Sequence, residues 1–293
     1  MGFRDRIDVC HRWQPDRYRP FLIGDARHGW IDAALARRLR DFPAVFDVDV
    51  AAVRLSPALD SETRRTAAMA DVLAQLRESG DLPYWRDELY PVTRDWSVPP
   101  VMLMERGAVP RFGVRAFGVH LNGLVRRGDE VLVWVARRSL AKEVAPGKLD
   151  NSVAGGQPHG LSFMDNLVKE CAEEAGIPPA LACQARQVAV LEYVCEQPDG
   201  LRDDVAVCFD LWLPADFVPR NTDGEVESFE LWPLARAMAV VRDSDAFKFN
   251  CALVLIDLFD RLGALGPDDP DYDAIVAGLG RSLETRPHGR SSG

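Results

Sequence analysis

Three glutamates in one short segment have the types and spacing of a metal site. Glu170, Glu173 and Glu174 occupy relative positions 0, +3 and +4, which places their side chains side by side on one face of a helix. Carboxylates crowded on one stripe repel each other unless a cation lies among them. Hard divalent cations prefer carboxylate oxygens, so the spacing predicts a Mg²⁺ site that can hold a diphosphate. A solvated acidic helix face is the simpler alternative.

Residues upstream of these acids have the chemistry of phosphate binding. The pair Gly155 and Gly156 lets a backbone approach phosphates closely. Arg137 offers a forked contact to phosphate and Lys148 a point charge, although surface solubility explains both residues equally well. Trp134 is a candidate for stacking on an aromatic ring of the substrate, with core packing as the commoner alternative.

The acids must be carried by a helix that follows a strand and a glycine loop. Residues 149–154 read as a short strand that leads into the glycine pair. Ser162 has the character of an N-cap and Gly176 that of a helix stop, so the sequence predicts a helix over residues 163–175. Asp165 is expected to complete a capping box with Ser162.

The stretch from Gly155 to Ile177 resembles the Nudix box, the signature of the Nudix hydrolases (MutT-like). The positions that match are Gly155, Glu170, Glu173, Glu174, Gly176 and Ile177. Leu161 and Lys169 stand where the box has a glutamate and an arginine, and an ion pair between Asp165 and Lys169 is expected to replace the usual brace. The resemblance implies an α+β fold, a Nudix α/β/α sandwich with a mixed sheet.

Other segments are similar to one branch of this superfamily, the Nudix domain found beside thiamine pyrophosphokinase. The similar segments are residues 134–139, 146–151, 154–160 and 247–257. This resemblance implies a pyrophosphohydrolase that converts thiamine diphosphate, or its oxidised analogues, to the monophosphate. Oxidised nucleoside diphosphates such as 8-oxo-dGDP are alternative substrates. A Nudix protein that senses a ligand without turnover is an alternative of another class.

The resemblance also implies roles for the acids. Glu170 and Glu174 are the expected Mg²⁺ ligands, with Glu173 as a third, and Mn²⁺ is expected to substitute for Mg²⁺. Glu225 is a further candidate ligand. The acid that accepts the proton of the attacking water is left open among the box glutamates and the downstream acids, which are Asp203, Asp204, Glu225 and Glu227. Nudix enzymes often dimerise, so a homodimer is expected.

Composition limits the partners of this chain. Its 293 residues carry a net charge of −10, which disfavours nucleic acid polymers and anionic membranes as partners. The six cysteines form no CxxC pair, as is typical of a reducing compartment. The N-terminus is charged and lacks an apolar core, so no signal peptide is predicted. The expectation is a cytoplasmic enzyme with a small-molecule diphosphate substrate and no membrane partner.

The pattern of elements divides the chain into three parts. Residues 1–110 read as a small α+β domain of unknown function, which the resemblance makes a candidate for substrate recognition. Residues 111–265 are richer in strands and contain the Nudix box. Residues 266–293 form a C-terminal extension that is expected to fray at its end.

Overall fold

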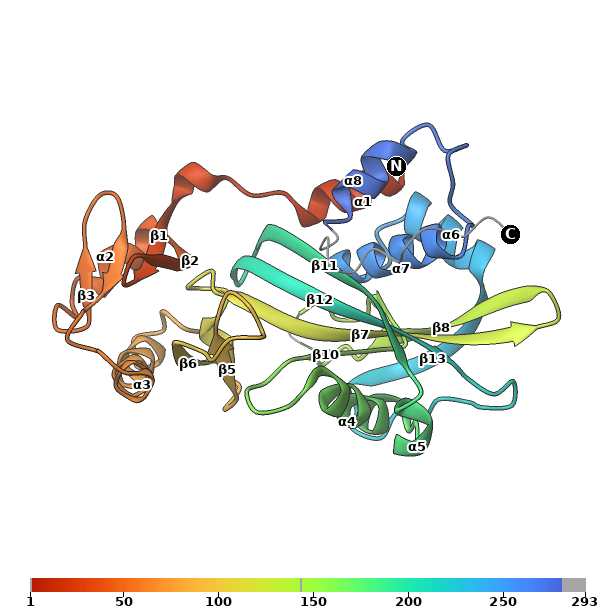
Figure 1. Ribbon diagram of the computed structural model, residues 1–293, viewed down its shortest axis with the longest axis horizontal. Coiled ribbons are helices and arrows are strands. Elements are labelled where there is room, and N and C mark those ends of the chain that lie inside the picture. The colour runs from red at the N-terminus through yellow and green to blue at the C-terminus, as the bar shows by residue number, and fades with distance from the viewer. Residues whose placement is uncertain (1, 143, 281–293) are drawn as a thin grey trace.

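The computed structural model describes residues 2–142 and 144–280 of the chain, in two parts that lie side by side (Figure 1). The N-terminal part has a four-stranded sheet in the order β2-β1-β4-β3. The strands are β1 (Tyr18–Ile23), β2 (Ala26–Asp32), β3 (Phe46–Val48) and β4 (Val53–Leu55). Its further elements are η1 (Pro15–Arg17), α2 (Ala33–Leu39), α3 (Glu62–Glu78), β5 (Leu89–Val92), β6 (Met102–Glu105) and η2 (Arg106–Ala108).

Short polar side chains start the two helices of this part. Asp32 accepts a hydrogen bond from the Leu35 backbone N–H at 2.8 Å, and Ser61 likewise caps α3, as expected of N-cap residues. The antiparallel pair β5–β6 packs beside α3. One apolar cluster joins the four-stranded sheet, α2, α3 and the β5–β6 pair, so these elements form a single core.

The C-terminal part is built on a mixed seven-stranded sheet. Its main order is β11-β12-β7-β8-β13, with β10 paired to β7 and β9 paired to β8. The β12–β7 pairing is parallel and the others are antiparallel. The strands are β7 (Arg115–Arg127), β8 (Glu130–Arg138), β9 (Leu149–Asp150), β10 (Val153–Gly156), β11 (Arg186–Gln197), β12 (Gly200–Trp212) and β13 (Val226–Pro233).

Helices cover both faces of this sheet (Figure 1). Helices α4 (Phe163–Ala175) and α5 (Pro179–Ala182) lie on one face, and α6 (Leu234–Asp243) and α7 (Phe249–Arg261) lie on the other. A separate apolar cluster fills each of the two interfaces. The predicted α/β/α sandwich with a mixed sheet, preceded by a small α+β part, is confirmed.

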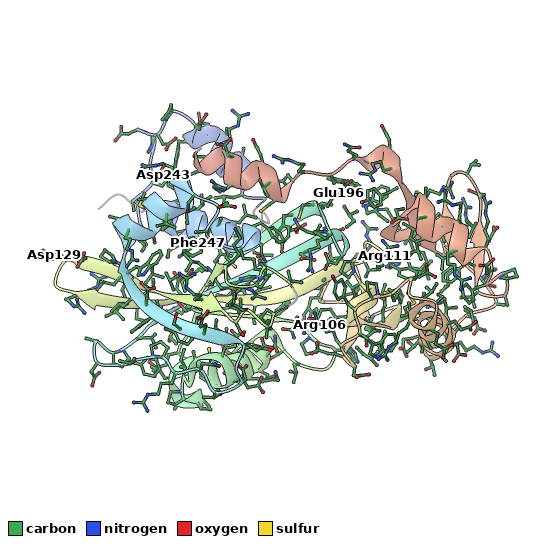
Figure 2. All side chains as sticks on the ribbon, turned by 180° about the vertical axis from the view of Figure 1, so that it is seen from behind. Arg106, Arg111, Asp129, Glu196, Asp243 and Phe247 are labelled. Carbon is green, nitrogen blue, oxygen red and sulfur yellow. The ribbon has the colours of Figure 1, made fainter. Side chains whose placement is uncertain are left out.

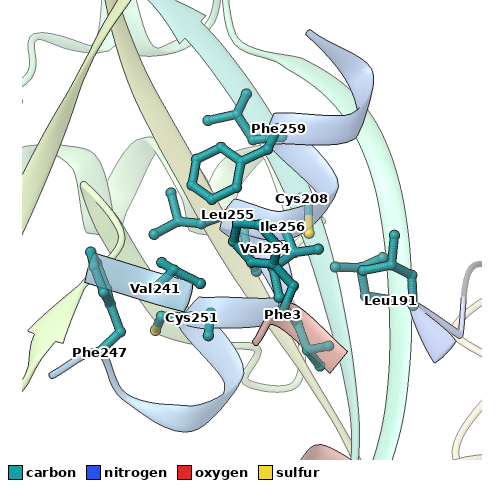
Figure 3. Packing of buried hydrophobic residues seen from close by; sticks show 14 of the residues in the cluster. Phe3, Leu191, Cys208, Val241, Phe247, Cys251, Val254, Leu255, Ile256 and Phe259 are labelled. Carbon is teal, nitrogen blue, oxygen red and sulfur yellow. The ribbon is translucent and has the colours of Figure 1, made fainter. Parts of the chain in front are cut away.

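The first helix of the chain packs in the C-terminal part. Helix α1 (Phe3–Cys10) lies against α7 and α8 (Tyr272–Gly278). Figure 3 shows Phe3 among the side chains of α7, and the rings of Phe3 and Phe259 are 6.0 Å apart. Residues 3–10 therefore contribute to the core of the sandwich although they precede the N-terminal sheet in sequence. The division at residues 110 and 265 stays a prediction, and the end expected to fray, residues 288–293, lies outside the described residues.

Two further properties bear on the predictions from composition. All six cysteines are free thiols, and only Cys183 is exposed. Within residues 2–142 and 144–280, no helix combines the length and the apolar character needed to cross a bilayer.

Candidate active site

Local interactions set the ends of the helix that carries the acids. The Ser162 hydroxyl accepts a hydrogen bond from the Asp165 backbone N–H at 3.1 Å and donates to the Asp165 carboxylate at 2.6 Å. Gly176 ends α4 with φ of 61°, a left-handed conformation that favours glycine. The predicted helix over residues 163–175 is thus confirmed. The expected capping box is replaced by this side-chain pair, because the short Asp165 carboxylate bonds to the hydroxyl of Ser162.

Two of the three box glutamates point into the protein against strand β10. Glu174 is only 6% exposed, and its Oε2 accepts a hydrogen bond from the Ala154 backbone N–H at 2.9 Å. The side chain of Glu170 is 15% exposed and lies against Gly155, where a methyl group would come within 2.3 Å of its Cδ. The glycine therefore provides the space that this carboxylate occupies.

Burial makes the charged forms of these two glutamates costly. Burial raises the pKa of Glu174 well above its usual value, and the nearby charges of Asp150, Glu170 and Glu225 raise it further against the Ala154 hydrogen bond. Burial also raises the pKa of Glu170, and Glu173 and Glu225 add to the effect while Lys169 opposes it. The neutral forms of both glutamates are therefore favoured as long as no cation compensates their charge.

Lys169 interacts with the box acids. Its Nζ lies 2.6 Å from the Glu173 carboxylate and 3.3 Å from that of Glu170. The expected Asp165–Lys169 pair is therefore wrong, since Asp165 is engaged at the start of the helix. Glu173 is 47% exposed, whereas Glu170 and Glu174 are largely buried.

The carboxylates fit a divalent ion whose remaining ligands come from the substrate and from water. In the part of the chain that the structure describes, no three His, Cys, Asp or Glu side chains converge into a ready-made metal cage. Mg²⁺ does not require such a cage, because it is commonly bound by one or two carboxylates together with substrate phosphates and water. Glu170 and Glu174 supply two carboxylates whose uncompensated charge a cation would relieve.

Glu225, the remaining candidate ligand, pairs with Lys142. Burial raises its pKa, but the Lys142 hydrogen bond and the charges of Lys142, Arg106 and Arg138 outweigh burial and hold that pKa below its usual value. Glu225 nevertheless acts electrostatically on both Glu170 and Glu174. The structure thus brings Glu225 toward the box acids from a loop about fifty residues downstream.

The other downstream acids are held by arginines or lie in the open. Asp203 pairs with Arg115 at 3.1 Å, and Asp204 lies 3.6 Å from Arg202. Glu227 is exposed on β13. Both Asp203 and Asp204 are therefore engaged by arginines outside the box, although burial raises the pKa of Asp203.

The predicted phosphate-binding cations have different surroundings. Arg137 donates from Nη1 to the Gly147 carbonyl at 3.0 Å. Lys148 donates to the backbone carbonyl of Asp245 at 2.6 Å and lines a cavity. Trp134 is only 8% exposed and belongs to the apolar layer beneath α4. Its packing favours the core alternative, and its stacking on a substrate stays a prediction.

The cavity beside Lys148 has a volume of about 360 Å³. Its wall is mostly apolar and includes Tyr84, Phe247 and Phe249, with Lys248 among the charged residues. Asp150 links this cavity to the acids, because it interacts electrostatically with Lys248 and with Glu174. The cavity has the size and lining of a small-molecule site.

Sequence reasoning missed a set of contacts from the N-terminal part. The His159 backbone N–H donates to the Leu89 carbonyl at 3.1 Å. Trp96 packs on Phe163, the first residue of α4, with ring centroids 4.8 Å apart. Both contacts join segments more than sixty residues apart, and no local pattern in the sequence marks them. The N-terminal part thus holds the loop between β10 and α4.

Two residues of the N-terminal part also lie against the second glycine of the pair. A methyl group on Gly156 would lie 1.6 Å from the Tyr90 hydroxyl and 3.2 Å from the Arg106 Nη2. Tyr90 is 5% exposed, and the Arg106 guanidinium lies 5.4 Å from the centroid of its ring. Gly156 is therefore the point where the N-terminal part meets the predicted phosphate loop.

Several known proteins are similar to this chain. A family model described as a domain of unknown function, DUF4743, matches residues 3–116. Nudix hydrolase 24, chloroplastic, of Arabidopsis thaliana is 42% identical over 92% of this chain and 75% of its own length. Nudix hydrolase 20, chloroplastic, of the same plant is 41% identical over the same shares. The NUDIX domain of Shewanella oneidensis NrtR, solved with ADP ribose, has 15% identity and a TM-score of 0.42 over 52% of this chain and 90% of that chain.

Fold, acids and relatives together define a hydrolase that acts on pyrophosphate bonds. The chain belongs to the Nudix hydrolases and carries a DUF4743 domain at its N-terminal side. Members of this family generally use a divalent metal and act on small molecules. The alternative of a Nudix protein without turnover is therefore not supported.

The predicted cytoplasmic localisation is wrong. Both Arabidopsis relatives, which align with 92% of this chain, are named chloroplastic. The prediction rested on reduced cysteines and on a charged N-terminus, and neither property distinguishes one reducing compartment from another.

Proposed function

We propose that this Nudix hydrolase uses Mg²⁺ to cleave the phosphoanhydride bond of thiamine diphosphate, or of its oxidised analogues, and releases the monophosphate and phosphate. The observation that carries the proposal is the pair of buried carboxylates, Glu170 and Glu174, packed against the glycine strand β10. The substrate class rests on the similarity of residues 134–139, 146–151, 154–160 and 247–257 to the Nudix domain found beside thiamine pyrophosphokinase. The cavity of about 360 Å³ beside Lys148 has room for a small heteroaromatic group.

In this proposal Glu170 and Glu174 hold the Mg²⁺, and Glu173 binds it directly or through water. The ion would neutralise phosphate charge and lower the pKa of a bound water. The Gly155–Gly156 backbone lies along the diphosphate, with Lys148 and Arg137 as its cationic contacts. Each of these residues is a proposed member of the site.

The box acids are the better candidates for accepting the proton of the attacking water. A general base works best when its pKa approaches the working pH. Burial raises the pKa of Glu170 and Glu174, whereas Lys142 and nearby cations hold that of Glu225 down. Glu225 is therefore proposed to orient Lys142 and to add to the field around the metal.

Phosphate release from thiamine diphosphate and its oxo and oxy forms, with and without Mg²⁺, tests the proposal. The wild type should release phosphate only with Mg²⁺ or Mn²⁺, and Glu170→Gln should remove most of the activity. Faster release from 8-oxo-dGDP in a parallel panel would replace thiamine diphosphate by a nucleotide. Absence of release from any diphosphate would reject the reaction itself. The homodimer implied by the resemblance is tested separately by sedimentation equilibrium.

A further inference from the structure

Arg106, in the N-terminal domain, carries a positive charge to the edge of the Nudix site. It begins η2, directly after β6. Figure 2 shows it where the β5–β6 pair meets the C-terminal part. Its Nη1 pairs with Glu88 at 2.7 Å, while its Nη2 lies 3.2 Å from the position that a methyl group on Gly156 would take. The pairing with Glu88 therefore holds the guanidinium with one nitrogen directed at the phosphate loop.

The surroundings of Arg106 are more anionic than a single ion pair explains. Besides Glu88, the charge of Glu170 acts on this arginine, and Arg106 in turn acts on Glu225. Glu170 is a proposed metal ligand, and Glu225 acts electrostatically on it. Glu170 lies against Gly155 and Arg106 lies against Gly156, so these opposite charges border adjacent residues of the predicted phosphate loop.

Tyr90 gives this arginine a fixed support. Its ring lies beneath the guanidinium, and its hydroxyl is a buried oxygen without a hydrogen-bond partner among the described residues. A buried hydroxyl without a partner is costly, so its position against Gly156 is not explained by stability. The close approach of Tyr90 to Gly156 brings Arg106 near the loop and leaves no space for a side chain at position 156.

We infer that Arg106 is a phosphate-binding residue of the Nudix site, supplied by the DUF4743 domain and positioned by Tyr90. It would bind the non-bridging oxygens of a diphosphate, because a guanidinium matches phosphate geometry with two parallel hydrogen bonds. The side chain is 44% exposed and can reach a ligand without unfolding the loop. The inference rests on the proposed diphosphate chemistry and is independent of the organic group.

Calorimetric binding of imidodiphosphate, a diphosphate with a nitrogen bridge, tests this inference in the full-length protein with Mg²⁺. Arg106→Gln should weaken binding by about tenfold or more, because it removes a charge-assisted contact. Arg106→Lys should fall between wild type and Arg106→Gln, since lysine keeps the charge without the fork. In turnover assays the loss should appear mainly as a raised KM.

Arg54→Gln is the matched control. Arg54 also lies in the N-terminal domain, is 39% exposed and pairs with one carboxylate, that of Asp49. It should bind imidodiphosphate like the wild type, and both glutamine variants should melt within a few degrees of it, as is usual for exposed ion pairs. Wild-type affinity in Arg106→Gln, an equal loss in Arg54→Gln, or no binding by the wild type would overturn the inference. Failure of the thiamine diphosphate assay alone would leave it standing.

Discussion

Gly155 and Glu170 are in direct contact, so that a methyl group on the glycine would lie 2.3 Å from the carboxyl carbon of the glutamate. The contact connects strand β10 to helix α4 beside the box glutamates. It makes the glycine of the Nudix box a determinant of where a carboxylate points, in addition to any role of its backbone toward phosphate.

Gly155→Ala tests this contact. The added methyl group must displace the Glu170 carboxylate, so we expect kcat to fall by roughly tenfold or more while the protein still folds. Gly266→Ala is the control, because a methyl group there meets no atom within 4 Å. Unchanged turnover in Gly155→Ala would mean that the position of Glu170 is not critical.

Glu174→Gln should separate stability from activity. The buried charge of Glu174 is unfavourable without a metal, since its pKa is raised well above the usual value. An amide of the same size keeps the acceptor for the Ala154 N–H, so the metal-free variant should melt at a higher temperature than the metal-free wild type. Its activity should fall by at least 10–100-fold, the loss typical of a disturbed metal site. A lower melting temperature would contradict the view that the buried charge of Glu174 is unfavourable without a metal.

Magnesium should stabilise the folded protein through the same carboxylates. A ligand that binds only the native state adds about 2.7 kcal/mol at a hundred times its Kd, so urea unfolding of the wild type should shift with Mg²⁺. Glu170→Gln should reduce this shift strongly. Glu173→Gln should retain more of it, because Glu173 is half exposed and turned toward Lys169. Equal shifts in all three proteins would place the metal elsewhere.

Gly156 and Tyr90 should be energetically coupled. Gly156→Ala forces a methyl group onto the Tyr90 hydroxyl, and overpacking of this kind costs about 1–3 kcal/mol. Tyr90→Phe alone should leave the free energy of unfolding unchanged or raise it, since the hydroxyl has no partner among the described residues. The double variant should regain part of the stability that Gly156→Ala loses. Strict additivity in urea unfolding would show that the two residues do not touch in solution.

Acid should destabilise the sandwich through His120. This residue is 5% exposed on β7, and its Nδ1 lies 3.0 Å from the Asn151 Oδ1. Burial lowers its pKa to about 4, and the charge of Lys248 lowers it further, against the opposing effects of Asp150 and Asn151. The unfolded chain therefore binds a proton near pH 6.5 that the folded protein takes up only near pH 4.

The contribution of His120 to the free energy of unfolding is complete above about pH 6.5. It is lost as the pH falls toward 4, by about 3 kcal/mol in total. Urea unfolding of the wild type and of His120→Gln at pH 7.0 and 4.5 measures it. The wild type should lose more stability than the variant over this interval. Parallel losses in the two proteins would show that other groups cause the acid sensitivity.

The predictability of this site from sequence depends on the range of the interactions. Helix α4 and its two ends were predictable, because Ser162 and Gly176 act on their immediate neighbours. The spacing of the acids likewise sets which side chains share a face. The partners of Lys169 were not predictable, because Asp165, Glu170 and Glu173 all lie within its reach and tertiary packing decides among them. For Trp134 the sequence cannot distinguish a core residue from a ring that stacks on a ligand.

The contribution of the N-terminal domain could not be predicted at all. Tyr90 and Arg106 precede the box glycines by about fifty residues or more, and neither stands in a recognisable motif. They meet Gly156 only because the β5–β6 pair docks through β5 beside β7, the strand that pairs with β10. Contacts of this kind depend on how two folded units dock, which residue spacing does not encode.

The position of α1 has a consequence for how the chain can be divided. Because α1 completes the apolar layer over α7, a fragment that begins at residue 111 would expose apolar side chains of α7. Such a fragment would be prone to aggregate. The DUF4743 match begins at residue 3 and so includes α1, which means that removing the whole match would also remove the helix that covers α7. The N-terminal part and the sandwich therefore depend on each other for a complete core.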